Sequence, residues 1–397
     1  MATQPRLFCD QRATRQLLVD VSIIAAHDAG TGIQRVVRSL LLQLLETPPP
    51  GFRIRPVRAT RKRSYCYANS YLATLTSSAS VDDDDDVQVF NGDVFLGLDL
   101  ASRIVPRRQL DLLRWRVKGV RFAFVVYDLL PLLHRHWFTS RACRSFRHWV
   151  STLAIHADTL ICISNSVSNE VRSCMALRFN LTGNEPTTEW FHLGADLLPD
   201  QAPVATIDLH LADANADPRP RAVLMVGTIE PRKGHAQVLD AFDLLWRGGS
   251  GTRLIIAGKQ GWHVDSFIER LTGHPEAGTR LLWLPDIDDI QLTKLYAELD
   301  GLIMASNAEG FGLPLVEAAQ YGMPLFARNL PVFREVAGHH ATYFTAESGV
   351  ELAPQLSIWL DQLDQGTAPC SLAIKSLTWS ASAEQLRELI TLLAQPR

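Results

Sequence analysis

The chain has 397 residues, of which 47% are hydrophobic and 20% are charged, and its formal net charge is −3. This length is more than a single hydrophobic core usually serves, so it predicts two domains. The sequence has no apolar run long enough to cross a bilayer and no apolar segment close to Met1, so we expect neither a transmembrane helix nor a secretory signal. Six cysteines without a Cys-x-x-Cys pair or metal-like spacing are typical of the reduced thiols of a cytosolic enzyme.

The charges are unevenly distributed along the chain. Residues 1–200 contain 24 Lys and Arg against 19 Asp and Glu, whereas the remaining residues contain 15 against 23. A basic first half and an acidic second half suit an anionic ligand on one side of the molecule. Uneven surface composition explains the same counts equally well.

The first half alternates strands with helices. Leu17–Ser22 predicts a strand, and apolar residues at helical spacing predict a helix that begins near Gly32, after a loop that contains Gly30. Ligands of open α/β sheets bind at the carboxyl ends of strands, and Asp128 and Ser164–Ser166 are expected at two such ends. The other predicted strands of this half are at residues 52–57 and 87–96, within 120–131, where the strand runs into a polar turn, and within 157–167, where a Ser/Asn turn leads into a helix.

Two basic stretches interrupt this pattern. Arg58–Tyr67 is suited to acceptor phosphates or a membrane surface, although we favour a solvated loop. Arg103–Arg121 is predicted to be a basic amphipathic helix, which is typical both of peripheral membrane enzymes and of ordinary surface helices. Asp82–Asp86 is predicted to be a mobile loop and not a metal site, because its spacing matches no EF-hand.

The second half repeats the order of strand, loop and helix after a proline-containing linker predicted at residues 201–220. A strand at 222–226 leads through Gly227–Gly234 into a helix, and a strand at 301–305 leads through Ser306–Gly312 into another. The other expected elements are a strand and glycine turn at 254–262, strands at 281–286 and 323–327, and helices at 291–299, 331–337 and 383–393.

The loop that follows the strand at 301–305 has the composition of an anion site. Its glycines let the backbone approach a ligand closely, and its amides precede a helix whose first turn contains a proline. Glu309 and Glu317 lie on either side of this site. Because carboxylates repel phosphate but accept hydrogen bonds from hydroxyls, the pattern predicts a ligand with a central diphosphate and hydroxyl-rich rings, a nucleotide sugar. The predicted anion-binding residues are Gly310, Phe311, Gly312 and Leu313.

Two segments resemble a known family. Glu309–Glu317 resembles the E-x7-E signature of the family 4 retaining glycosyltransferases, and Val226–Gly234 resembles the donor-phosphate loop of the same family. The resemblance implies the GT-B fold, in which two Rossmann-like βαβ domains face each other across a cleft. It divides the chain into an acceptor-binding domain at 1–200, a linker at 201–220, a nucleotide-sugar domain at 221–375 and a helix at 376–397 that crosses back to the first domain.

The resemblance also implies roles for the donor-site residues. Glu309 is expected to bind hydroxyls of the transferred sugar, and Glu317 those of the ribose. Arg232 and Lys233 are expected to neutralise the diphosphate and the charge that develops on it as the sugar leaves. The other residues expected to contact the donor are Gly30, Gly32, Gly227, Gly310, Phe311, Gly312 and Leu313.

One position departs from the family pattern. The family often has a His-Asp pair where this chain has Tyr127-Asp128. We therefore take Asp128, and after it His134, as the candidates for the polar catalytic partner of the transferred sugar.

The implied activity is retaining transfer of a hexose or deoxyhexose, with mannose favoured, from a nucleoside diphosphate sugar such as GDP-mannose to a hydroxyl of a saccharide acceptor. The blocks at 126–131 and 331–338 are similar to those of bacterial mannosyl- and rhamnosyltransferases of surface polysaccharides. That similarity implies a lipid-linked acceptor in O-antigen synthesis and a cytoplasmic protein with peripheral contact to the inner membrane. No metal, other cofactor or nucleic acid is expected.

Two alternatives stay open: a GT-B nucleotide-sugar epimerase and a non-catalytic carbohydrate-binding subunit. A Rossmann dehydrogenase is excluded, because no Gly-x-Gly-x-x-Gly follows a strand with an acidic residue about 20 positions later.

Overall fold

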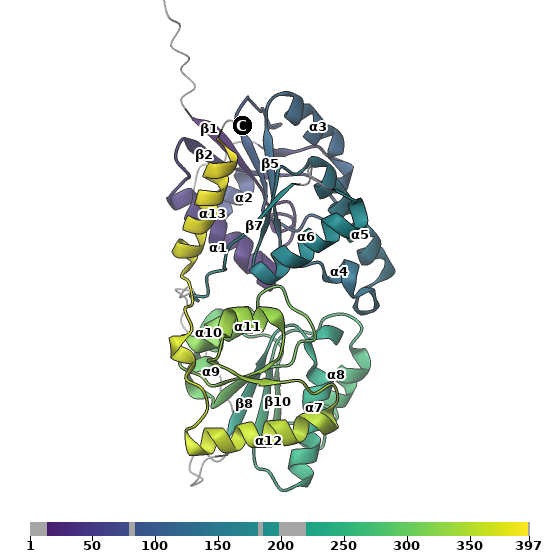
Figure 1. Ribbon diagram of the computed structural model, residues 1–397, viewed down its shortest axis with the longest axis vertical. Coiled ribbons are helices and arrows are strands. Elements are labelled where there is room, and N and C mark those ends of the chain that lie inside the picture. Colours follow the sequence, from purple (N-terminus) through teal and green to yellow (C-terminus); the bar gives the residue numbers. More distant parts are fainter. Residues whose placement is uncertain (1–13, 79–83, 182–185, 198–219, 396–397) are drawn as a thin grey trace, which may run out of the picture.

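The computed structural model describes residues 14–78, 84–181, 186–197 and 220–395. They form two α/β domains that lie one above the other in Figure 1, each built on its own sheet. The predicted fold class, two domains with parallel sheets, is confirmed.

The sheet of the first domain has the strand order β3-β2-β1-β4-β5-β6-β7. Its strands are β1 (Arg15–Asp20), β2 (Phe52–Arg58), β3 (Cys66–Tyr67), β4 (Val94–Gly97), β5 (Arg121–Val126), β6 (Thr159–Cys162) and β7 (Thr187–Trp190). The strands pair in parallel except at the edge, where β3 is antiparallel to β2. The helices are α1 (Gly32–Glu46), α2 (Asn69–Leu75), α3 (Gln109–Val117), α4 (Leu130–Leu133), α5 (Ser140–His156) and α6 (Asn165–Phe179), with single turns η1 (Val105–Arg107) and η2 (Arg135–Trp137).

The sheet of the second domain has the order β10-β9-β8-β11-β12-β13, and all its pairings are parallel. Its strands are β8 (Ala222–Val226), β9 (Arg253–Ala257), β10 (Leu281–Leu284), β11 (Gly301–Met304), β12 (Leu325–Arg328) and β13 (Thr342–Phe344). Its helices are α7 (His235–Arg247), α8 (Asp265–Thr272), α9 (Asp289–Glu298), α10 (Leu313–Ala319), α11 (Pro331–Ala337) and α12 (Gly349–Gln365), with turns η3 (Pro231–Lys233) and η4 (Ser371–Ala373).

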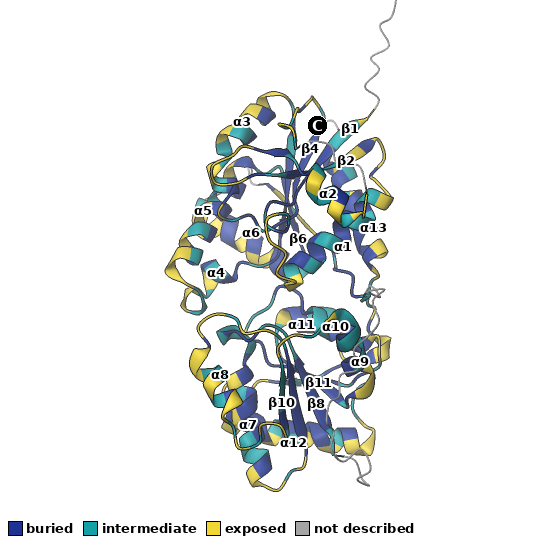
Figure 2. Ribbon diagram, turned by 180° about the vertical axis from the view of Figure 1, so that it is seen from behind, coloured by how far each residue is buried: buried dark blue, intermediate teal, exposed yellow. Residues whose placement is uncertain are grey.

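Burial explains why the central strands are apolar throughout. Every residue of β4, β9 and β11 is buried, because helices cover both faces of each sheet (Figure 2). Strands covered in this way do not show the alternation of half-buried strands. The helices in contrast bury one stripe only; on α1 that stripe includes Val36, Val37, Leu40, Leu41 and Leu44.

The last helix, α13 (Trp379–Leu393), packs against α1 of the first domain, as Figure 1 shows (yellow beside purple). Leu386 and Ile390 of α13 are fully buried, and each such side chain stabilises the packing by about 1.5–3 kcal/mol. The guanidinium of Arg15 donates to the carbonyl of Ala394 at 3.2 Å, which fixes the end of α13 beside β1.

Two segments that connect the domains run side by side. The backbone N–H of Ala195 donates to the carbonyl of Leu377 at 3.0 Å, and the backbone N–H of Trp379 donates to the carboxylate of Asp196 at 2.6 Å. A side chain at Gly194 would place its Cβ 2.5 Å from the backbone nitrogen of Trp379. The two segments can therefore come this close only because residue 194 is a glycine.

Two predicted elements of the first domain were wrong in extent. The strand predicted at 87–96 is reduced to β4, because Gly92 adopts a φ of 86° in the turn that precedes it. The helix predicted over Arg103–Arg121 is the turn η1 followed by the nine residues of α3, and Arg121 already lies in β5. Pro106 lies in η1, where its missing N–H costs nothing.

The proposed linker at 201–220 lies outside the described residues except for Pro220, and Asp84–Asp86 are the described part of the acidic run at 82–86. The domain boundaries at 200 and 375 stay predictions. Among the described residues, no helix is both long enough and apolar enough to cross a membrane. The described cysteines, which are all but Cys9, are free thiols.

Candidate active site

Strand order brings the two predicted donor loops together. β8 and β11 are neighbours in the second sheet and run in parallel, so the segments that follow them leave the sheet at the same edge. The segment after β8 contains Arg232 and Lys233, and the segment after β11 contains Glu309. Glu309 is thereby placed in direct contact with Arg232 and Lys233, although these lie 77 and 76 positions earlier in the sequence.

Glu309 is held between these two cations. Its Oε2 lies 2.9 Å from Nη1 of Arg232, and its Oε1 lies 2.5 Å from Nζ of Lys233 and accepts a hydrogen bond from the Ser306 hydroxyl at 2.7 Å. Burial alone would raise the pKa of the Glu309 carboxyl, but the two cations outweigh it and lower that pKa to about 2. Glu309 is therefore ionised throughout the physiological range.

The cations are positioned by their own loop. Arg232 donates from Nε to Glu230 at 2.9 Å and from Nη1 to the carbonyl of Ala308 at 3.1 Å, and its carbonyl accepts the N–H of Asn307 at 2.7 Å. Gly227 adopts a φ of 132° beside the Lys233 side chain. Among the described residues, Nη2 of Arg232 has no partner, and Lys233 makes one hydrogen bond with its three donors. Both cations therefore retain donors for a further anion.

The first domain closes over this loop at Gly310. The Ser164 hydroxyl donates to the carbonyl of Gly310 at 2.8 Å. A Cβ at Gly310 would lie 2.0 Å from the carbonyl oxygen of Tyr127, at the end of β5. The strand ends predicted to face the cleft, those of β5 and β6, thus meet the glycine loop directly.

Asp128 and His134, the two candidates for the sugar's catalytic partner, differ in position. Burial raises the pKa of the Asp128 carboxyl, and the charges of Arg232, Lys233 and Glu309 act on it, so it lies in the field of the donor loops. His134 stacks on the ring of Trp137 at 4.4 Å between centroids, and burial and His136 lower its pKa. No hydrogen bond or ion pair among the described residues joins His134 to Glu309. The role of either residue toward the sugar stays a prediction.

Glu317 lies on α10 and is buried, with 2% of its side chain exposed. Its Oε1 accepts a hydrogen bond from Arg35 of α1 at 2.7 Å and its Oε2 accepts one from Tyr296 at 2.8 Å. Burial raises the pKa of the Glu317 carboxyl, which Arg35 and Tyr296 partly offset. The two predicted glutamates are thus both tied by hydrogen bonds, Glu309 within its own domain and Glu317 to the opposite one.

The glycine loop before α1 is exposed. Gly30 adopts a φ of 67°, and its N–H donates to Asp28 at 3.0 Å. Thr31 begins α1 with a capping box that involves Gln34. Nothing lies within 4 Å of an added Cβ at Gly30 or Gly32, so both glycines face open space.

A second carboxylate of the second domain also contacts the first domain. Glu335 of α11 accepts hydrogen bonds from the backbone N–H groups of Asn165 and Ser166 at 2.7 and 2.8 Å, at the start of α6. It also accepts one from the Ser166 hydroxyl at 2.6 Å and contacts Nε2 of His192 at 2.8 Å. A carboxylate at a helix N-terminus is stabilised by the orphan N–H groups and the helix dipole.

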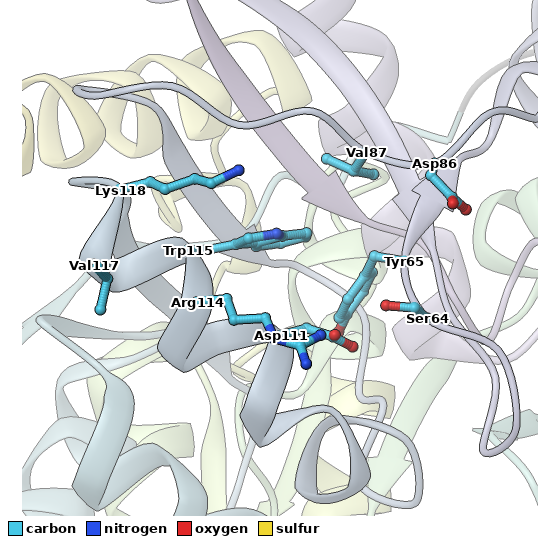
Figure 3. Close-up of a pocket in the computed structure, with 9 residues that line it drawn as sticks. All are labelled: Ser64, Tyr65, Asp86, Val87, Asp111, Arg114, Trp115, Val117 and Lys118. Carbon is cyan, nitrogen blue, oxygen red and sulfur yellow. The ribbon is translucent and has the colours of Figure 1, made fainter.

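Two further cavities lie in the first domain and contain none of the predicted site residues. One, of about 470 Å³, lies beside α3 and is lined by Tyr65, Asp111 and Trp115, among others (Figure 3). The other, of about 550 Å³, lies between η1 and α5.

Sequence reasoning missed several residues of this site. Arg35, Tyr296 and Ser306 hold the two predicted glutamates, and Glu335 holds α6. Ser306 was inside the glycine loop but has no local signature. In the sequence, Arg35 resembles an ordinary charged residue of a helix surface and Tyr296 an ordinary aromatic residue of a core. Their contact with Glu317 becomes visible only in the folded structure.

Two α/β domains, each built on a mainly parallel sheet, that meet at the carboxyl ends of their strands are the arrangement of the GT-B class of folds. Solved structures agree. HepE from Anabaena, in complex with UDP and glucose, superposes with a TM-score of 0.60 at 14% identity, covering 96% of this chain and 97% of that one. A glycosyltransferase from Rickettsia africae gives 0.64 at 13% identity, covering 97% and 100%. At such identities these likenesses show the fold alone.

Sequence comparison identifies the family. Residues 207–362 match the model described as glycosyl transferases group 1, and this part of the chain belongs to that family. The chain is also 42% identical over 394 residues to the serotype-specific mannosyltransferase WbdA of Escherichia coli. That alignment covers 97% of this chain and 46% of WbdA, so the chain spans about half the length of that relative.

Proposed function

We propose that this chain is a retaining glycosyltransferase that moves a hexose from a nucleoside diphosphate sugar to a hydroxyl of a saccharide acceptor. The observation that carries the proposal is the Glu309 carboxylate held between Arg232 and Lys233 at the ends of β8 and β11. This cluster supplies, at adjacent positions, cations for a diphosphate and an ionised acceptor for sugar hydroxyls. A group-transfer reaction of a nucleotide sugar requires both.

In the proposed reaction, the bond from the anomeric carbon to the phosphate oxygen breaks and the bond to the acceptor oxygen forms on the same face. The acceptor's proton passes to the leaving phosphate oxygen. Arg232 and Lys233 stabilise the charge that grows on the diphosphate, with the donors that Glu309 leaves unused. Glu309 fixes hydroxyls of the transferred sugar, Glu317 fixes the ribose, and Asp128, with His134 as the second choice, contacts the sugar from the first domain.

Mannose is the sugar we propose, with GDP-mannose as the donor. WbdA is named a mannosyltransferase, and the O-antigen chain mannosyltransferase B of Escherichia coli is 37% identical over 122 residues, which cover 29% of this chain and 30% of that protein. We infer a role in O-antigen synthesis from the same names. The transfer is proposed to need no divalent metal, because the two cations take over charge neutralisation.

The acceptor we propose is a lipid-linked saccharide, met by a cytoplasmic protein in peripheral contact with the inner membrane. The cavity between η1 and α5 supports it. Arg107, Arg141, Arg144 and His148 line this cavity, its lining includes no carboxylate, and the three arginines have no carboxylate partner among the described residues. Ile155, 69% exposed, belongs to the same wall. Cations beside an exposed apolar side chain suit a phosphate at a lipid surface.

The first experiment measures binding and turnover of GDP-mannose, dTDP-rhamnose, UDP-glucose and UDP-N-acetylglucosamine in EDTA. The proteins are the wild type, Glu309→Ala and the control Glu276→Ala, whose carboxylate pairs with Arg280 on the surface. We expect one donor to be consumed by the wild type and the control, and Glu309→Ala to lose at least about 100-fold in turnover.

Each alternative has its own signature in this assay. An epimerase returns a different nucleotide sugar and releases no diphosphate. A non-catalytic subunit binds a donor or a saccharide without consuming it. Absence of binding to all four donors would refute the donor site itself.

A further inference from the structure

Arg35 reaches from the first domain to two carboxylates of the second. Its Nη1 lies 2.7 Å from Oε1 of Glu317, and its Nη2 lies 2.5 Å from Oδ1 of Asp289. The Glu317 side chain is 2% exposed, whereas that of Asp289 is 36% exposed. The guanidinium therefore connects a buried carboxylate to one at the rim.

Glu317 retains capacity for a ligand despite these bonds. A carboxylate offers about four lone-pair positions, and Arg35 and Tyr296 occupy one on each oxygen. Tyr296 is itself buried, with 1% exposed, so the carboxylate is fixed from both sides. Among the described residues, Arg35 is the cation that contacts Glu317. A buried carboxylate that loses its cation becomes costly to keep ionised.

We propose that Arg35 is a positioning residue for the donor nucleotide: it keeps Glu317 ionised and oriented for the ribose hydroxyls, and it makes this arrangement depend on closure of the two domains. The inference rests on the proposed role of Glu317 as ribose ligand. Arg35 lies three residues after Gly32 on α1, so movement of the glycine loop and the state of the ribose ligand are mechanically linked. The guanidinium's second bond, to Asp289, fixes its plane.

The test compares GDP with dideoxy-GDP, the analogue that lacks both ribose hydroxyls, by titration calorimetry. The proteins are the wild type, Arg35→Ala, Arg35→Lys and Arg270→Ala. Arg270 is a matched control, because it also joins two carboxylates, Asp240 and Asp243, at 2.6 and 2.8 Å on the outside of the second domain.

We expect the wild type and Arg270→Ala to prefer GDP by about tenfold or more, as hydrogen bonds to a charged group do. Arg35→Ala should bind both nucleotides with nearly equal affinity, because it loses affinity for GDP while its affinity for dideoxy-GDP changes little. Arg35→Lys keeps one of the two bonds and should fall between. It also supplies the measurement if Arg35→Ala does not fold.

Three results would overturn the inference in distinguishable ways. Full preference for GDP in Arg35→Ala would show that Glu317 needs no help from Arg35. Equal loss for both nucleotides would show that Arg35 acts on the diphosphate. If the wild type binds neither GDP nor UDP nor dTDP, the proposed function itself fails, and the inference fails with it.

Discussion

Gly310→Ala is predicted to lower turnover by about 100-fold while leaving each domain folded. The added Cβ would lie 2.0 Å from the carbonyl oxygen of Tyr127, where real Cβ contacts stay above 3.0 Å. Tyr127 cannot yield, because it is 3% exposed at the end of β5 and its hydroxyl donates to Leu98 at 2.8 Å. The two domains must therefore separate by about 1 Å at this point, and a misplacement of that size costs about 100-fold in rate.

The assay is donor consumption under saturating donor, with thermal melting to confirm folding. Gly251→Ala is the control, because an added Cβ there meets nothing within 4 Å. Gly310 itself needs no positive φ, so alanine imposes no backbone strain and the clash alone is tested. Equal turnover of the Gly310→Ala and Gly251→Ala proteins would refute the argument that closure at Tyr127 is required.

Three further predictions concern titration and the contact between domains. The pKa of Glu309 is lowered from 4.5 to about 2 on folding, so its contribution to stability is complete above pH 4.5 and is lost as the pH falls toward 2. The unfolding free energies of the wild type and Glu309→Gln, measured by denaturant melts, should therefore converge on acidification, and a constant difference would contradict this. Burial lowers the pKa of His235 from 6.5 to about 3, and its ring nitrogens have no hydrogen-bond partner among the described residues. The wild type should therefore lose stability as the pH falls below 6.5, whereas His235→Leu should not show this loss. If the melting temperatures of the two proteins change in parallel from pH 8 to 5, this prediction is wrong. Glu335→Gln should cost about 1–3 kcal/mol of unfolding free energy, measured against Glu276→Gln as control; no loss would show that the α6 contact is not maintained in solution.

Local chemistry made parts of this structure predictable. The helix at Pro331–Ala337 and the strand at Ala222–Val226 were predicted with the bounds that the structure has. In both, the signals lie within or next to the element itself. The helix has a proline in its first turn and a glycine after its last residue, and the strand is a short apolar run. The two loops that follow β8 and β11 were also placed correctly at strand ends, since glycines at close approaches and residues at strand ends follow local rules. Their role in donor binding stays a prediction.

What the sequence did not predict lies in contacts between distant elements. Arg35 and Glu317 are 282 positions apart, and Glu335 and Asn165 are 170 apart. Periodicity places each on the correct element but does not say which faces of two domains will meet. The helix predicted over Arg103–Arg121 was wrong for a related reason. Its arginines and leucines have a spacing that is suitable for a helix, but Arg121 lies in β5, which pairs with β4 and β6.

The paired connections at Ala195–Leu377 and Asp196–Trp379 also limit how the molecule can move. Two segments that are hydrogen-bonded to each other between two rigid bodies form a hinge, and rotation about this hinge is the motion that they leave free. Residues far from the hinge then move the furthest. The substrate's entrance would then be set by the position of one short two-stranded joint, with no need for either sheet to deform.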